Sequence, residues 1–181
     1  MPEFKSLAEY IKAFENGCPD YCKDDERPSR LKIDLKITKG TKFNQACRLS
    51  ALALTAKKTN YERHSLVENF MLINDSTTIA CEVPVWFWEK NLNAGIFGHI
   101  DLLQVRFGLI YVMDYKPEAI HENVQKVASQ LLFYSSGLSF RTKIPLDKFR
   151  CAWFDDEVYY EFNPREANVK YHRSGGKSWH G

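Results

Sequence analysis

A chain of 181 residues is long enough for one domain with a sizeable core, and 44% hydrophobic with 27% charged residues is ordinary for a globular protein. These values exclude a collagen-like, low-complexity or largely disordered chain. The formal net charge of +2 gives no overall basic field, so a nucleic-acid partner would have to be recognised by local groups.

The sequence carries no sign of a membrane or secreted protein. No apolar run approaches the roughly 20 residues of a membrane-spanning helix, and "MPEFKSLAEY" lacks the apolar block of a signal peptide. The cysteines are odd in number and scattered, which favours reduced thiols over disulfides, with a metal site as the minor alternative. They are Cys18, Cys22, Cys47, Cys81 and Cys151. We therefore expect a soluble, intracellular, cytoplasmic protein with no membrane partner.

Residues 1–58 are predicted to extend the domain with helix and strand segments. Residues 6–17 have one apolar face and predict a helix. Residues 18–30 are polar and charged, which indicates an exposed loop. Residues 31–38 alternate between apolar and polar side chains and predict one half-exposed strand. Alanine and leucine favour a helix over residues 44–58.

Residues 59–165 alternate between helical and strand patterns. Helical periodicity covers 60–73 and 121–134. Strand patterns cover 78–88, 96–105, 109–115, 149–155 and 157–162. The last four strands predict two antiparallel hairpins, and Pro84 places the first strand at an edge or a bulge. Residues 166–181 are polar and rich in glycine and are expected to form a flexible tail, so the whole chain predicts one α/β domain with a mixed sheet.

The hairpin of residues 96–115 carries charges among apolar residues. Asp101 lies in its first strand and Asp114 near the end of its second, and Lys116 shares a face with Asp114. Nearby carboxylates repel each other unless a proton or a cation joins them. Mg²⁺ suits carboxylate oxygens, and a lysine beside it can orient a water or stabilise charge on a phosphate. The alternative is an ion pair between Asp101 and Lys116 without a catalytic role.

Other polar residues extend this candidate site. Glu82 adds an acid on the strand that precedes the hairpin, and its alternative is a solvated side chain. His64 and Glu68 share one face of the helix before it, and either could supply a further ligand. Gln130 and Tyr134 are four residues apart on the later helix and could hold a phosphate or a water, although core packing explains the same spacing.

These motifs together resemble a known family. The sequence contains "GHID", then "MDYK" with its aspartate thirteen residues after that of "GHID", and then "QLLFY" on a helix. This order is similar to the RecB-type branch of the PD-(D/E)XK nuclease superfamily, which carries G-x-x-D, D-x-K and Q-x-x-x-Y in the same order. "CEVPV" resembles a glutamate-bearing strand of that branch. The likeness covers about residues 60 to 162. It implies a stand-alone nuclease domain with a restriction-endonuclease-like fold, whose core is residues 59–165, whose central hairpin carries the site and whose helices flank the sheet.

The resemblance also implies roles for the candidate residues. The ligands of Mg²⁺ or Mn²⁺ would be Asp101, Asp114, the carbonyl of Tyr115 and Glu82, with His64 or Glu68 as a further ligand. Lys116 would position the attacking water or stabilise charge on the phosphate, and Gln130 and Tyr134 would support the site. Relatives with an iron–sulfur cluster carry three cysteines after these motifs, where this chain has only Cys151. No cluster is therefore expected.

The function implied is hydrolysis of DNA phosphodiester bonds, in repair, recombination or defence. Candidate DNA contacts are Lys57, Lys58, Arg63 and Lys126, the tail residues Lys170, Arg173 and Lys177, and the aromatic Trp86 and Trp88. For each of these residues taken singly, a solvated charge or a core aromatic is the preferred explanation. The alternatives are another metal-dependent hydrolase and a catalytically silent nucleic-acid-binding or assembly module with this fold. Self-association, repair or recombination partner proteins, and the choice between endonuclease and exonuclease stay open.

Overall fold

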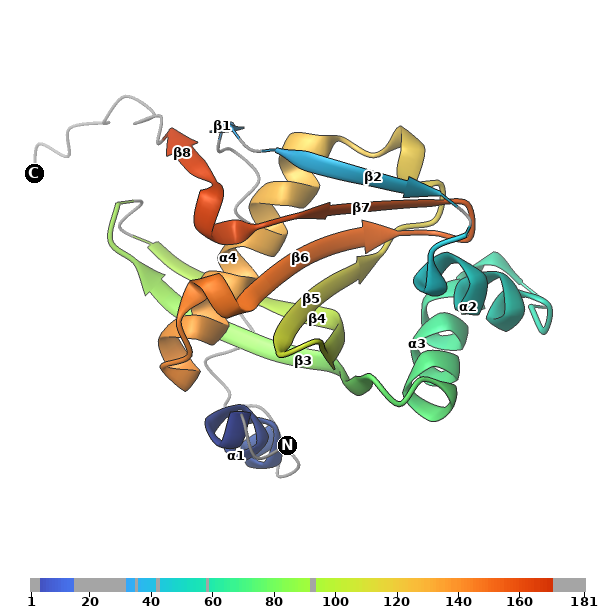
Figure 1. The fold of residues 1–181 in the computed structure, drawn as a ribbon, viewed down its shortest axis with the longest axis horizontal. Helices are drawn as coiled ribbons and strands as arrows, with labels where there is room; N and C mark the ends of the chain where they lie inside the picture. The colour runs from blue at the N-terminus through green and yellow to red at the C-terminus, as the bar shows by residue number, and fades with distance from the viewer. Residues whose placement is uncertain are drawn as a thin grey trace, which may run out of the picture.

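The computed structural model describes residues 4–14, 32–34, 36–41, 43–57, 59–91 and 94–170 (Figure 1). A six-stranded sheet in the order β2-β7-β6-β5-β4-β3 forms its centre, with β5 and β6 parallel and the other neighbours antiparallel. The strands are β2 (Ile37–Thr41), β3 (Thr78–Glu89), β4 (Ala94–Arg106), β5 (Leu109–Tyr115), β6 (Phe149–Phe154) and β7 (Val158–Phe162). The predicted α/β class with a mixed sheet is confirmed.

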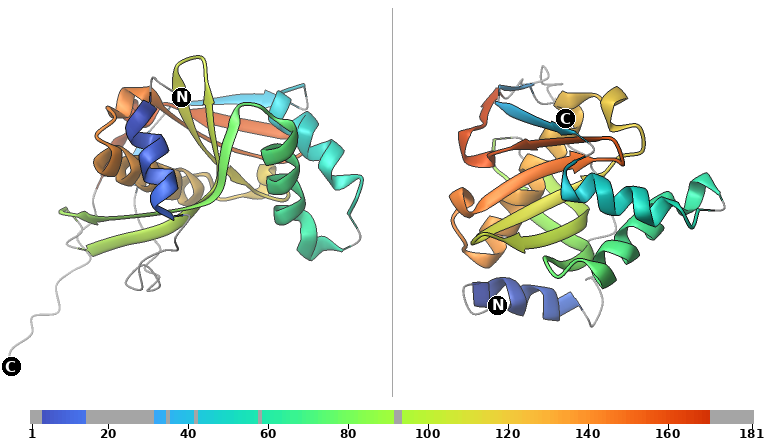
Figure 2. Two further views of the ribbon diagram at one scale, coloured as in Figure 1. Left: turned by 90° about the horizontal axis from the view of Figure 1, so that it is seen from below. Right: turned by 45° about the vertical axis from the view of Figure 1, so that its right-hand side comes forward.

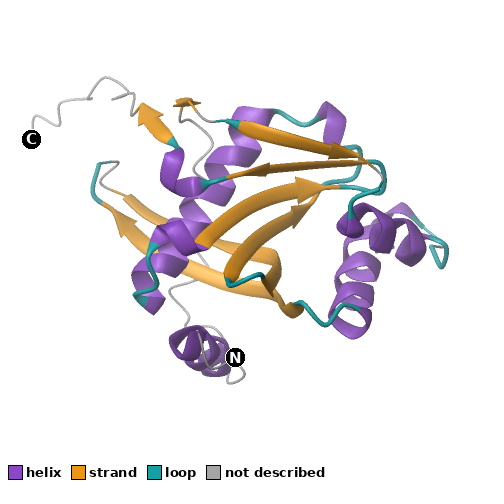
Figure 3. Cartoon of the chain, in the orientation of Figure 1, coloured by secondary structure: helices purple, strands orange, loops and turns teal. Residues whose placement is uncertain are grey.

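Four α-helices of the described segments cover this sheet (Figure 3). They are α1 (Lys5–Phe14), α2 (Gln45–Leu54), α3 (Arg63–Asn74) and α4 (Val124–Thr142). The face that α1 and α4 cover has a buried cluster that includes Leu131 and Trp153. The face that α2 and α3 cover has a second cluster around Met71 and Tyr115. Within the described segments, no helix has both the length and the apolar character needed to cross a bilayer.

All four predicted helices and both predicted hairpins are present. The helix predicted over 6–17 is described as far as Phe14, and α4 continues to Thr142, beyond its predicted end. The predicted loop over 18–30, with Cys18 and Cys22, lies outside the described residues. Of the described cysteines, Cys47, Cys81 and Cys151 are free thiols, and burial raises the pKa of each to about 12.

The single strand predicted over residues 31–38 was wrong. Lys32–Asp34 forms β1, which pairs with β8 (Asn168–Lys170) in a separate two-stranded sheet, whereas β2 pairs with β7 in the main sheet. An alternating pattern determines which side chains share a face but not which strand is the partner, so it did not reveal this change of partner. β8 lies inside the predicted tail, and residues 171–181 are outside the described chain.

The β3–β4 pair turns sharply away from the sheet at one position (Figure 2). Glu82 and Asp101 face each other there, because the pairs Cys81↔Leu102 and Val83↔Ile100 flank them. Cys81 and Leu102 pack on the α2–α3 side, whereas Val83 and Ile100 pack on the α4 side. Regular alternation would place residues two apart on one face, so both strands change orientation at this pair. The φ angle of Glu82 is 51°, in the left-handed region that is strained for a residue with a side chain.

β3 is an edge strand of the sheet, as Pro84 predicted. On the other side, β4 pairs with β5 only from Leu102↔Met113 to Arg106↔Leu109. Asp101 and Asp114 therefore lie just beyond the last paired residues, where β4 separates from β5. The candidate site is built at this separation.

Candidate metal centre

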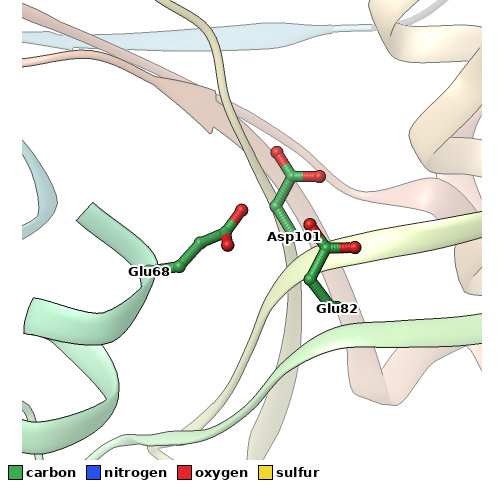
Figure 4. Close-up of side chains that lie close together, drawn as sticks. All are labelled: Glu68, Glu82 and Asp101. Atoms are coloured by element: carbon green, nitrogen blue, oxygen red, sulfur yellow. The ribbon is translucent and has the colours of Figure 1, made fainter. Parts of the chain in front are cut away.

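Three carboxylates converge beside the bend. Glu68 from α3, Glu82 from β3 and Asp101 from β4 each have an oxygen within 4.8 Å of the other two (Figure 4). Val67 and Met71 are fully buried on α3, and this packing turns the adjacent Glu68 toward the sheet. Glu68 is only 7% exposed, and its Oε1 atom has no hydrogen-bond partner among the described residues. A buried carboxylate oxygen without a partner is costly, so this position suits a cation.

Asp101 is held by the backbone of the neighbouring strand. Its Oδ2 atom accepts a hydrogen bond of 3.0 Å from the backbone N–H of Tyr115. Because β4 and β5 no longer pair at this level, the carboxylate takes the place of the backbone carbonyl that would otherwise accept this hydrogen bond from Tyr115. The bond fixes the orientation of Asp101 relative to the end of β5.

Asp114 and Lys116 form an ion pair at the end of β5. The Nζ atom of Lys116 lies 2.9 Å from Oδ1 and 2.8 Å from Oδ2 of Asp114, which is 2% exposed. The backbone N–H of Lys116 also donates to the carbonyl of Phe154 on β6, at 2.9 Å. The structure thus pairs Lys116 with Asp114, whereas the non-catalytic alternative paired it with Asp101.

Burial and the neighbouring carboxylates shift the pKa values of the groups in this site. Burial raises the pKa of Asp101 far above its usual range, and the charge of Asp114 raises it further. Burial raises the pKa of Glu68 to about 7, with Glu82 as the next cause. Burial lowers the pKa of Lys116, but the charge and the hydrogen bond of Asp114 outweigh this effect and the net pKa is raised. At neutral pH Lys116 is therefore a cation, and without a metal Asp101 retains its proton.

His64 and Tyr115 lie at the side of this cluster. The group of converging ligand atoms among the described residues contains Glu68 but not His64, although both were open candidates. His64 is exposed, and its ring meets the ring of Tyr115 edge to face at 5.2 Å between centroids. The side chain of Tyr115 is fully buried, and its backbone N–H is the group that Asp101 engages.

Gln130 and Tyr134 lie on α4 and contact each other. The Nε2 atom of Gln130 donates to the hydroxyl of Tyr134 at 3.3 Å. Tyr134 packs directly on Gly98, where an added Cβ atom would collide with the hydroxyl and the ring. The glycine of G-x-x-D and the tyrosine of Q-x-x-x-Y are therefore direct neighbours, which the separate motifs did not predict. Gly98 lets α4 approach β4 three residues from Asp101.

The candidate DNA contacts are dispersed. The Nζ atom of Lys57 donates to Oδ1 of Asn60 at 3.1 Å, and Lys126 is exposed in the first turn of α4. Arg63 begins α3, where it is half-buried. Trp86 packs against α1, whereas Trp88 is 59% exposed. Lys58, Arg173 and Lys177 lie outside the described residues, and the side chain of Lys170 does as well.

Two features of the site were not predicted. Asp155 is buried, and its Oδ2 atom accepts from the backbone N–H of Ala119 at 2.8 Å, which anchors the loop after Lys116. Its position where the predicted hairpin of residues 149–162 turns was the only available signal, since aspartate favours turns. A cavity of about 360 Å³ adjoins Glu82 and includes His99 in its lining. It depends on α1, which is remote in sequence, and no local pattern could have revealed it.

No protein-family model matches this chain, and no curated protein sequence matches it. Its function is therefore inferred from the chemistry of the site.

Proposed function

We propose that this protein is a metal-dependent nuclease of the PD-(D/E)XK type that hydrolyses DNA phosphodiester bonds with Mg²⁺ or Mn²⁺. The observation that carries the proposal is the convergence of Glu68, Glu82 and Asp101 within 4.8 Å, beside the ion pair of Asp114 and Lys116. The order of the G-x-x-D, D-x-K and Q-x-x-x-Y motifs on a mixed α/β sheet supports it.

The donor set fits a hard divalent cation. All the converging groups are carboxylates, and Mg²⁺ and Mn²⁺ prefer oxygen ligands. The Oε1 atom of Glu68 has no hydrogen-bond partner among the described residues, and burial together with neighbouring carboxylates raises the pKa of both Glu68 and Asp101, which a bound cation would reverse. The strained φ angle of Glu82 fits a functional position, since such strain clusters at active sites.

Different residues would bind the cation and contact the phosphate or the water. Glu68, Glu82 and Asp101 would hold the cation, which when bound supplies a water of lowered pKa and polarises the phosphate. Lys116, aimed by its two contacts with Asp114, would donate to a phosphate oxygen or orient the attacking water. In the net reaction the water oxygen would bond to phosphorus and one P–O ester bond would break, while the water gives up a proton and the departing oxygen takes one up.

A cleavage assay tests the proposal. Purified protein is incubated with labelled single- and double-stranded oligonucleotides in Mg²⁺, Mn²⁺ or EDTA, beside Asp101→Asn and Lys116→Met. We expect metal-dependent cleavage that each substitution lowers by about 10²-fold or more. Glu157→Gln, which changes an exposed acid in the β6–β7 turn, is the matched control and should cleave as the wild type does.

Thermal melting of each variant separates a lost function from a lost fold. Equal cleavage by the wild type, Asp101→Asn and Lys116→Met would contradict the proposal, because the activity would then come from another site or a contaminant. DNA binding without cleavage under any metal condition would favour the catalytically silent module instead.

A further inference from the structure

A cavity of about 360 Å³ lies between α1 and the bent β3–β4 pair. Ile11 and Phe14 of α1 form one wall, and residues 80–84 of β3 with His99 of β4 form the other. Its volume is within the range of sites that bind small organic groups, about 300–1,000 Å³. Glu82 and His99 in its lining are exposed, so the cavity opens to solvent.

The cavity and the carboxylate cluster share one residue. Glu82 belongs to both, because it lines the cavity and converges with Glu68 and Asp101. Cys81, the next lining residue, donates its thiol to the backbone carbonyl of Glu68 at 3.4 Å. A phosphate held at the carboxylates would therefore carry its neighbouring nucleoside to the mouth of this cavity.

The walls of the cavity suit a flat, apolar group with polar edges. Apart from Glu82 and His99 the lining is apolar, and Phe14 supplies an aromatic ring. That ring is held in place by Tyr10, at 4.6 Å between centroids, and by Trp86, at 5.5 Å. The hydroxyl of Tyr10 in turn donates to the carbonyl of Pro84 at 2.8 Å, which fastens α1 to β3. The stacking surface is thus preorganised.

We propose that this cavity binds an unpaired nucleobase next to the scissile phosphate, so that the substrate is single-stranded DNA or a frayed duplex end. The inference rests on the proposed nuclease function. A base can stack on Phe14 and present its edge to His99 only after it has left its own base pair. A fully paired duplex cannot fill the cavity.

The test combines DNA binding with cleavage. Fluorescence anisotropy in Ca²⁺ measures the affinity for a single-stranded oligonucleotide, for the same strand in a closed hairpin duplex, and for a strand with abasic sites. We expect the wild type to bind the single strand about 10-fold more tightly than either of the others. Ile11→Trp, which fills the cavity, and Phe14→Ala, which removes the ring, should each remove this preference, whereas Phe14→Trp should keep it.

Three controls keep the outcomes separate. Phe107→Ala removes an aromatic side chain that is 91% exposed in the turn between β4 and β5, and the variant should bind as the wild type does. Melting curves and Mn²⁺ affinity, measured by calorimetry, should be unchanged in Phe14→Trp. His99→Ala, which removes an exposed side chain, should lower single-strand affinity even if the other variants are destabilised.

The results decide between the two proposals. Metal-dependent cleavage with equal affinity for single-stranded, abasic and duplex DNA would overturn the cavity assignment and leave the nuclease intact. Unchanged affinity in Ile11→Trp, Phe14→Ala and His99→Ala would do the same. A complete lack of metal-dependent cleavage by the wild type would overturn the nuclease function, and this inference with it.

Discussion

Replacing Glu68 by glutamine should stabilise the metal-free protein at alkaline pH. Glu68 is a buried acid whose pKa burial raises from 4.5 to about 7, with the charge of Glu82 as the next cause. Below about pH 4.5 the carboxyl is protonated in the folded and the unfolded chain, and it has no effect on stability. As the pH rises toward 7 only the unfolded chain releases the proton, so the folded state loses stability, and above pH 7 the whole loss is present.

The magnitude follows from the size of the shift. One pKa unit corresponds to about 1.4 kcal/mol, so the full shift would cost about 3 kcal/mol. Water at the open side of the cluster screens part of this, and we expect about 1–2 kcal/mol. For a chain of this length, 1 kcal/mol changes the Tm by about 2–4 °C. Glu68→Gln should therefore melt about 2–8 °C above the wild type at pH 8 in EDTA.

Thermal melting by circular dichroism at pH 8 and pH 5 measures this difference. At pH 5 most of the gain should vanish, because the wild-type carboxyl is then protonated in the folded state. Adding Mn²⁺ at pH 8 should reverse the order, since the wild type gains stability from the metal and the variant gains less. Glu157→Gln controls for the loss of one negative charge at an exposed position. A Tm difference that is the same at both pH values, or a less stable variant at pH 8, would contradict a raised pKa of Glu68 in the folded protein.

Three other contacts predict changes in the free energy of unfolding, which urea denaturation measures. Gly98→Ala should lower the free energy of unfolding by about 1–3 kcal/mol, because the added Cβ atom collides with Tyr134. The loss should be much smaller in a Tyr134→Ala background, and additive losses would contradict the contact. Asp75→Ala should lower the free energy of unfolding by about 2–4 kcal/mol. The Asp75 carboxylate, between α3 and β3, accepts hydrogen bonds from the hydroxyls of Thr77 and Thr78, from the backbone N–H of Thr77 and from the side-chain amide of Gln104. An unchanged stability would show that this network is dispensable. Lys116→Met should lower the free energy of unfolding by about 3 kcal/mol, because it leaves Asp114 buried without its cation. Adding Asp114→Asn to the same chain should restore most of this stability. If stability is not restored, lost packing and not the unpaired charge is responsible.

Spacing along single elements could be predicted from the sequence. Asp114 and Lys116 are two apart on a strand, and Gln130 and Tyr134 are four apart on a helix, so the period of each element brings them together. Pro84 correctly placed β3 at an edge, because proline has no N–H to give to a further strand. These features depend only on local geometry.

Relations between elements could not be predicted in the same way. His64 and Glu68 share one helix face, and the burial of Val67 and Met71 determines which of them turns toward the carboxylates. The pairing of Glu82 with Asp101 depends on the register of β3 and β4, which the hydrophobic pattern does not determine at a bend. The cavity requires α1 to pack on β3 across 74 residues of sequence, a contact that no periodicity encodes.

The most direct test of the metal centre is the rate of oligonucleotide cleavage as a function of Mn²⁺ concentration, for the wild type and Asp101→Asn. We expect no cleavage in EDTA and a rate that saturates with Mn²⁺ for the wild type. For Asp101→Asn we expect a much higher half-saturating concentration or no activity. Cleavage that persists in EDTA, or the same Mn²⁺ dependence in both proteins, would contradict a catalytic metal at these carboxylates.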